Sequence, residues 1–96
     1  MSDRDAYVEK MKAKLDEWNA ELNKLEAKSR QASADMQTNY EQQLKKLRAR
    51  RDEAEAQLKE LQRASEDSWE RVRKGMEEAW DDMNQAFRDA MDRFRS

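Results

Sequence analysis

The side chains of this chain that could perform chemistry are almost all carboxylates, ammonium groups and guanidinium groups. The 96 residues include no histidine and no cysteine, so the common nucleophile–base pairs and zinc-ligand sets cannot form. One acidic cluster has helical spacing and would attract a divalent cation loosely: Glu77, Glu78, Asp81 and Asp82. Because calcium sites wrap their oxygen ligands in a loop, we interpret this cluster as a solvated helix face. The sequence therefore predicts no enzymatic activity and no cofactor.

Two further clusters have a chemical and a structural interpretation. Thioethers that share a helix face could bind a soft metal, but methionine more often fills uneven gaps in a core; these are Met76, Met83 and Met91. The strongest basic cluster could contact phosphates, and it consists of Lys45, Lys46, Arg48, Arg50 and Arg51. Acidic neighbours at helical spacing and the absence of interleaved aromatic residues favour ion pairs. The sequence argues against metal and nucleic acid as ligands.

Composition determines which elements carry these residues. Charged residues make up 44% of the chain and hydrophobic residues 36%, with one glycine and no proline, which is typical of long helices and coiled coils. The net charge of −2 arises from interleaved acids and bases, so no global field indicates a partner. No apolar run has the length of a signal peptide or membrane span. We expect an all-α, cytoplasmic protein, with peripheral membrane attachment as the alternative.

The first two thirds of the chain show a heptad pattern. Apolar residues recur at alternating steps of three and four, which predicts a seam that a partner helix follows with a left-handed wrap. We expect this seam to hold chains together in a homo-oligomer through Val8, Met11, Leu15, Trp18, Leu22, Leu25, Leu44, Leu47, Leu58 and Leu61. Trp18 is wide for a two-stranded core, which favours broader packing around it.

The seam changes phase once, around Met36. A stutter of this kind locally unwinds a supercoil without breaking the helix, and the absence of glycine and proline there favours continuity. We therefore predict one long helix over residues 1–64. Thr38 followed by Glu41 has the spacing of a capping box, so a helix break near residue 38 remains the alternative.

The last third repeats every eleven residues, so that Trp69, Trp80 and Met91 occupy equivalent positions. Before it, residues 65–68 lack large apolar side chains, and Asp67 with Glu70 has capping-box spacing, which predicts a bend. The repeat predicts an amphipathic helix over residues 67–96. Its apolar face, called here the C-terminal stripe, comprises Trp69, Val72, Met76, Trp80, Met83, Phe87, Met91 and Phe94.

The expected architecture is a long coiled-coil helix followed by this shorter amphipathic helix, in a hairpin-like or oligomeric bundle. Exposing the C-terminal stripe to water would forgo roughly 1.5 to 3 kcal/mol per large side chain, so something must cover it. If the second helix folds back, it covers residues from about 35 to 64 and leaves the N-terminal seam for another chain. Otherwise a partner protein's helix or a lipid surface would cover the stripe.

Several segments resemble those of a family of small bacterial coiled-coil proteins of uncharacterised function. The resemblance rests on the opening Arg4–Lys12 segment, on Leu15–Ala20, and on Ser65, Glu66 and Asp67 before Trp69. It implies a coiled coil and no particular activity. The eleven-residue repeats are also weakly similar to those of exchangeable apolipoproteins, which implies lipid surfaces, whereas the balanced charges of the polar face argue against anionic membranes.

These observations lead to one hypothesis and one alternative. We expect a non-enzymatic, self-associating coiled-coil scaffold or adaptor that uses the heptad seam and the C-terminal stripe. The alternative is reversible attachment to a membrane or lipid surface through the C-terminal amphipathic helix.

Overall fold

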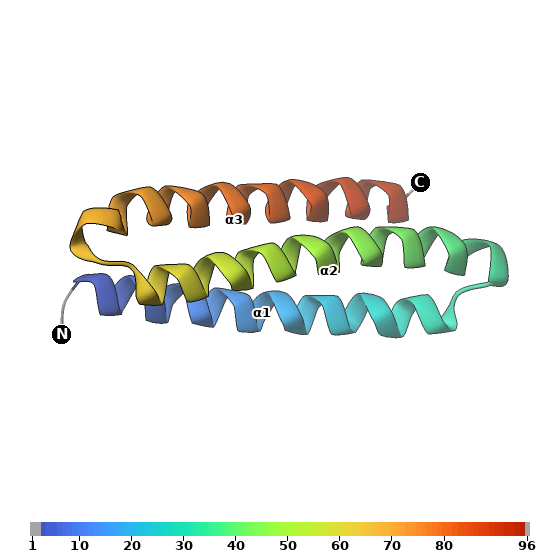
Figure 1. Cartoon of the computed structure of the whole chain (residues 1–96). Coiled ribbons are helices and arrows are strands. Elements are labelled where there is room, and N and C mark those ends of the chain that lie inside the picture. The colour runs from blue at the N-terminus through green and yellow to red at the C-terminus, as the bar shows by residue number, and fades with distance from the viewer. Residues whose placement is uncertain (1–2, 96) are drawn as a thin grey trace.

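Residues 3–95 fold into three helices of nearly equal length and no other regular element. The computed structural model describes residues 3–95, without the side chains of residues 94 and 95. Helix α1 spans Asp3–Gln31, α2 spans Ala34–Arg63 and α3 spans Glu66–Arg95 (Figure 1). The predicted all-α class is confirmed over this range. The composition explains the class, because strong helix formers dominate every segment.

Helix α2 lies between the other two along the whole bundle. The chain reverses direction at both turns, so α1 and α3 run parallel to each other and antiparallel to α2 (Figure 1). The Cα atoms extend over 51 × 20 × 17 Å, close to the length of about 45 Å expected for a helix of 30 residues. The bundle is therefore about as long as one of its helices, and its cross-section is that of a few packed helices.

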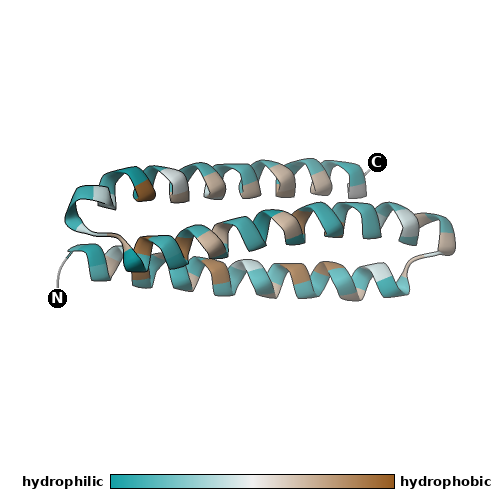
Figure 2. Cartoon of the chain, in the orientation of Figure 1, coloured by the Kyte–Doolittle hydropathy of each residue, from teal (hydrophilic) through white to brown (hydrophobic). Residues whose placement is uncertain are grey.

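The core is formed by the apolar faces that the heptad pattern and the eleven-residue repeat define. The buried residues of α1 are Met11, Leu15, Trp18, Leu22, Leu25 and Ser29, and those of α2 include Leu44, Leu47, Ala54, Leu58 and Leu61. Methionine and alanine supply the buried part of α3: Met76, Ala79, Met83 and Ala90. Strongly hydrophobic residues accordingly recur along α1 and α2 and are sparse on α3 (Figure 2). The heptad seam is thus covered within a single chain.

The prediction of one continuous helix over residues 1–64 is wrong. The helix ends at Gln31, and a new one begins at Ala34 after an extended residue, Ser33, with φ −63° and ψ 161°. The break also precedes the alternative near residue 38, since Thr38 lies inside α2. Folding back here brings the leucines of α2 onto the seam of α1. Burial of both faces outweighs the local preference of residues 29–36 for helix.

The second turn lies at the start of the predicted 65–68 bend. Residues Ala64 and Ser65 separate α2 from α3, and the cap differs from the expected Asp67–Glu70 pair. The Ser65 N–H donates to Ser68 Oγ at 3.0 Å, and the Ser68 N–H donates to Ser65 Oγ at 3.3 Å. Two serines therefore form a reciprocal capping box, which satisfies donors at the helix start.

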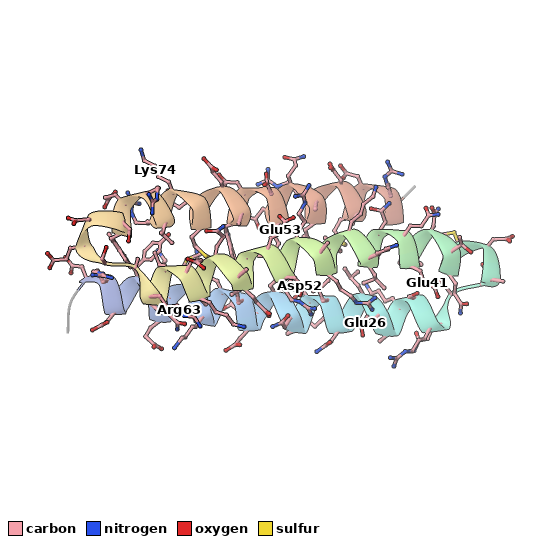
Figure 3. The ribbon with its side chains drawn as sticks, in the orientation of Figure 1. Glu26, Glu41, Asp52, Glu53, Arg63 and Lys74 are labelled. Atoms are coloured by element: carbon pink, nitrogen blue, oxygen red, sulfur yellow. The ribbon has the colours of Figure 1, made fainter. Side chains whose placement is uncertain are left out.

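Charged side chains cover the outside of the bundle and join α1 to α2 in one antiparallel register. Labelled residues such as Glu41, Arg63 and Lys74 extend away from the helices (Figure 3). Arg48 binds Glu26 across the helices at 2.7 Å, and Arg51 donates to Asn19 at 3.3 Å. Exposed pairs of this kind contribute little stability, but these two fix which residues of α1 and α2 face each other.

Leu22 tests whether the seam supports the fold of a single chain. Its side chain is 1% exposed, so Leu22→Ala should lower the free energy of unfolding by about 2 to 5 kcal/mol. Met36→Ala is the matched control, because Met36 is 36% exposed and should change stability by less than about 1 kcal/mol. Urea unfolding followed by circular dichroism measures both. Equal losses for the two variants would contradict the core assignment.

Gly75, the only glycine, faces α2 at close range. A Cβ added there would lie 2.8 Å from Oε1 of Gln57, which is the mobile end of a flexible side chain. Gly75→Ala should therefore displace that amide and stabilise the protein by up to about 1 kcal/mol through helix propensity. Thermal unfolding measures the change, and the Gln57→Ala background removes the obstacle. A loss of stability in both backgrounds would show that Gly75 is required for close helix packing.

Candidate functional site

The most distinctive surface of the bundle is the groove between α1 and α3. Within residues 3–95, no Cα atom of α1 lies within 8 Å of a Cα atom of α3, so only large side chains connect the two helices. Trp18 of α1 meets Trp80 and Phe87 of α3 at the bottom of a hollow of about 460 Å³. We call this hollow, with its rim residues Lys14, Glu17, Ala20, Glu21 and Asn84, the aromatic groove.

Ring geometry shows how the floor of the aromatic groove is built. The Trp18 and Phe87 centroids lie 4.9 Å apart in an edge-to-face arrangement, and the Trp18 and Trp80 centroids lie 6.5 Å apart. Trp18 is 7% exposed, whereas Trp80 and Phe87 are half-buried. Aromatic pairs of this type add about 0.5 to 1.5 kcal/mol beyond burial. The floor is thus rigid on the α1 side and accessible on the α3 side.

Trp18 has an unsatisfied polar atom. Its indole Nε1 is buried and has no hydrogen-bond partner within the described structure. Buried indole N–H groups usually find an acceptor, so the ring occupies this site for its size at the expense of one hydrogen bond. Trp18 is wide for a two-stranded seam, and this width allows its ring to reach the aromatic residues of α3.

The rim of the aromatic groove carries charge of both signs. The Lys14 ammonium lies 5.3 Å above the Trp80 ring, within the range of a cation–π contact. Glu17 and Glu21 are exposed and one helical turn apart on α1. The α3 side of the groove is lined by the uncharged residues Trp80, Asn84 and Phe87. The two exposed carboxylates of α1 therefore favour a cationic ligand surface.

A second aromatic cluster closes the end of the bundle near the second turn. Arg4 donates to the Ala64 carbonyl at the end of α2 and lies over the Trp69 ring, 4.5 Å from its centroid. The Tyr7 ring meets Trp69 edge-on at 6.0 Å. A cation at a helix C-terminus also interacts favourably with the helix dipole. These contacts fasten the start of α1 to the α2–α3 turn.

Electrostatic contacts extend this cluster along α3. Burial, followed by the charge of Glu77 and a hydrogen bond with it, raises the pKa of the Tyr7 phenol above 10.0. Arg73 binds Glu70 at 2.8 Å and Glu77 at 2.6 Å. The hydrogen bond from Arg73, and then its charge, lowers the pKa of Glu70. These polar contacts connect α1 to α3 and pair the Tyr7 hydroxyl with Glu77, which the ring contacts alone would not do.

The C-terminal stripe is divided by the fold into a covered and a half-covered part. Met76 and Met83 are fully buried. Five members are half-buried: Trp69, Val72, Trp80, Phe87 and Met91. The side chain of Phe94 lies outside the described residues. The heptad residues are more completely covered, with Val8 alone half-buried, so the seam and the stripe pack against each other.

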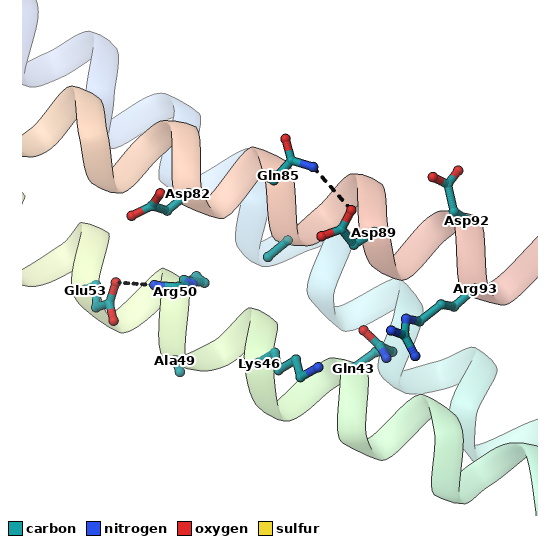
Figure 4. Close-up of a pocket in the computed structure, with 11 residues that line it drawn as sticks. Gln43, Lys46, Ala49, Arg50, Glu53, Asp82, Gln85, Asp89, Asp92 and Arg93 are labelled. Atoms are coloured by element: carbon teal, nitrogen blue, oxygen red, sulfur yellow. Dashed lines mark hydrogen bonds and ion pairs between the residues drawn. The ribbon is translucent and has the colours of Figure 1, made fainter.

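A larger polar groove, which the sequence did not indicate, separates α2 from α3. It encloses about 880 Å³ and is flanked by Lys46 and Arg50 on α2 and by Asp82 and Asp89 on α3 (Figure 4). Arg50 binds Glu53 at 3.2 Å within α2, and Gln85 donates to Asp89 at 3.2 Å within α3. Both of these contacts lie within one helix. Small lining residues such as Ala49 and Ala86 come from distant segments, so the pattern of neither segment alone indicates a groove.

The charged clusters singled out in the sequence lie on the surface as ion pairs or free side chains. Arg50 and Arg51 bind carboxylates of their own helix, as the neighbouring acids predicted, whereas Arg48 binds Glu26 of α1. Among residues 3–95, no three carboxylates gather closely enough to hold a metal ion. No helix in the same range combines the length and apolarity needed to cross a bilayer.

Tyr7 reports directly on the contact between α1 and α3. In a Tyr40→Phe background, absorbance titration should give Tyr7 a pKa above 10.0 in the folded protein, and Glu77→Gln should lower it. Because folding raises the pKa of Tyr7, the unfolded chain loses the phenol proton at a lower pH than the folded protein does. The stabilisation that Tyr7 contributes is therefore fully present below about pH 10 and declines as the pH rises through the folded pKa. Lys74→Gln, on the outer surface, is the control. An unchanged pKa in Glu77→Gln would contradict the contact.

Comparison with known proteins adds no relative. No protein-family model matches the chain, and neither a curated protein nor a solved structure is significantly similar to it. The resemblance to small bacterial coiled-coil proteins therefore stays a prediction, and the site rests on its geometry.

Proposed function

We propose that this protein is a non-enzymatic adaptor that binds an amphipathic helix of a partner protein in the aromatic groove. The observation that carries the proposal is the wide separation of α1 and α3, which leaves half-buried Trp80 and Phe87 lining an open groove along residues 14–21 and 80–87. A docked helix would complete a four-helix bundle and cover these rings. Large rings at the centre of a groove are typical anchors of binding energy.

Charge selects the partner helix. Glu17 and Glu21 line the α1 side of the groove, the Lys14 ammonium beside them lies over the Trp80 ring, and the α3 side is lined by uncharged residues. A helix with apolar anchors and flanking lysine or arginine would therefore be favoured over one with acidic flanks. The absence of histidine and cysteine supports a binding role without chemistry.

Attachment to a lipid surface is the second candidate. Helix α3 is the most amphipathic of the three, and its half-buried tryptophans would suit a headgroup region. Two features rank it lower. Its buried methionines already cover the core, and its formal charge of −3, from nine acidic and six basic residues, would be repelled by an anionic membrane.

Two designed helical peptides test the adaptor proposal. Both carry leucines at heptad positions, and their flanking residues are lysine in one and glutamate in the other. The lysine peptide should bind at least about tenfold more tightly, and Trp80→Ala should weaken it by about thirtyfold, as expected for a central tryptophan anchor. Calorimetric titration measures the affinities, and Met36→Ala should bind like the original protein.

Reversing the rim charge provides a test that leaves the core intact. Because Glu17 and Glu21 are exposed, the double variant Glu17→Lys/Glu21→Lys should fold normally and lose or invert the preference for the lysine peptide. Equal affinity for both peptides before and after this change would refute the groove assignment. Co-sedimentation with phosphatidylcholine vesicles, without peptide binding, would favour the lipid candidate.

A further inference from the structure

The turn between α1 and α2 departs from a continuous helix in very few backbone angles. Only Ala32 and Ser33 lie outside the helices, and Ser33 has a helical φ of −63° with an extended ψ of 161°. The Gln37 N–H already donates to the Ser33 carbonyl at 2.8 Å, as in a helix. The Ser33 side chain makes no capping hydrogen bond. A side-chain hydrogen bond across the turn is exposed and runs from the Gln37 amide Nε2 to the Arg30 carbonyl at 3.3 Å. Apart from this bond, little in the turn itself opposes its conversion into helix.

The turn between α2 and α3 is held far more firmly. Ser65 and Ser68 exchange backbone-to-hydroxyl hydrogen bonds, and Arg4 binds the Ala64 carbonyl across the bundle. Trp69, directly after this turn, packs against Tyr7 and Arg4. Of the two connections, the first is therefore the one that can open as a hinge.

The sequence across the first turn is compatible with helix throughout. Residues 26–40 contain neither glycine nor proline, and the heptad spacing of α1 continues through Ser29 and Ala32 to Met36. A segment with these features forms helix whenever no tertiary contact requires a reversal.

We propose that two copies of this chain exchange α1 through the first turn. In each copy, α1 and α2 join into one helix of about 90 Å, and α1 packs against α2 and α3 of the other copy. Every core contact that α1 makes in the single chain is then formed between chains, while α2 and α3 stay packed within each chain, so the two forms differ only at the hinge. In this dimer, a second copy of the chain therefore packs against the heptad seam of α1.

The register of α1 on α2 places the two-fold axis of this dimer at Met36. Half-way between the contacting residues Asn19 and Arg51 is residue 35, and half-way between Glu26 and Arg48 is residue 37. Met36 is the large hydrophobic side chain that stays exposed within the described residues. In the exchanged dimer, the two Met36 side chains would face each other across the axis and lose their exposure to water.

The rest of the bundle leaves room for this exchange. Helix α3 ends short of the first turn (Figure 1), so the two copies of α3 would not collide at the axis. Each aromatic groove would then combine α1 of one copy with α3 of the other, which gives two grooves per dimer. The inference does not depend on the proposed partner helix, because it concerns the hinge alone.

Two neighbouring substitutions shift the hinge in opposite directions. Ser33→Ala improves helix propensity at a position without a side-chain cap bond, and it acts twice per dimer, so dimerisation should occur at concentrations about tenfold lower. Ala34→Pro fits the first residue of α2, after an already extended residue, but would disrupt a continuous helix. That variant should stay monomeric. Glu66→Pro, at the first residue of α3, is the matched control and should dimerise like the original chain.

The experiment refolds each full-length protein from urea at concentrations up to about 1 mM, the range of effective concentrations for short linkers, and measures mass by light scattering. Spin labels then identify the exchange. The chain has no cysteine, so Ala20→Cys/Ala49→Cys labels two exposed positions cleanly. Diluted with unlabelled chains, a dimer with exchanged α1 should show about 44 Å between the labels of one chain. The closed bundle should show a distance within its cross-section of 20 × 17 Å.

Each outcome decides the proposal. A larger dimer fraction in Ser33→Ala, a monomeric Ala34→Pro and the long label distance together support it. A monomeric Ser33→Ala at the highest concentration, or a dimer that keeps the short distance, would overturn it. Circular dichroism identifies variants that fail to fold. Met36→Glu then provides the same test, because it places like charges at the axis of the dimer and leaves the closed bundle intact. This variant should lower the dimer fraction.

Discussion

The contact of Trp18 with Phe87 and Trp80 determines how the third helix sits on the other two. Leucine seams bring α1 and α2 close together, but no such seam connects α1 with α3, whose Cα atoms stay more than 8 Å apart in the described range. Aromatic rings and long polar side chains bridge that distance. The ring contacts bury Trp18 almost completely and leave Trp80 and Phe87 half-covered, so the same feature that closes the core creates the aromatic groove.

This arrangement explains the unequal composition of the three helices. Helix α2 contacts both neighbours and buries mainly leucine, whereas the fully buried residues of α3 are methionine and alanine. Alanine lets two backbones approach, and methionine fills what remains. Helix α3 contains no leucine, and its aromatic residues Trp69, Trp80 and Phe87 contact α1. The bundle is thus closely packed on both sides of α2 and open between α1 and α3.

The two turns show how differently a chain reversal can be encoded. Ser65 and Ser68 form a capping box, and Arg4 and Trp69 fasten it to the start of α1. Across residues 32 and 33 the side-chain contact is one exposed hydrogen bond, from Gln37 to the Arg30 carbonyl, and the reversal there depends mainly on burial of the seam on either side. A local signal can be identified in a sequence, as the 65–68 bend was, whereas a reversal enforced by distant contacts resembles a continuous helix. This is why the first turn was missed.

The sequence alone determined the all-α class, the faces of the helices and the position of the second turn, because residue propensity and apolar periodicity are local properties. Leu22, Leu47 and Met83 could be assigned to apolar faces on that basis. Only the tertiary structure decided which faces meet. The heptad residues of α1 fit a second chain and the leucines of α2 equally well, since both present the same periodic surface. Which of the two covers α1 depends on the free-energy cost of the short turn between α1 and α2 relative to the apolar burial that this turn permits. The separation of α1 from α3 depends on side-chain sizes, which matter only once the chain has reversed at that turn.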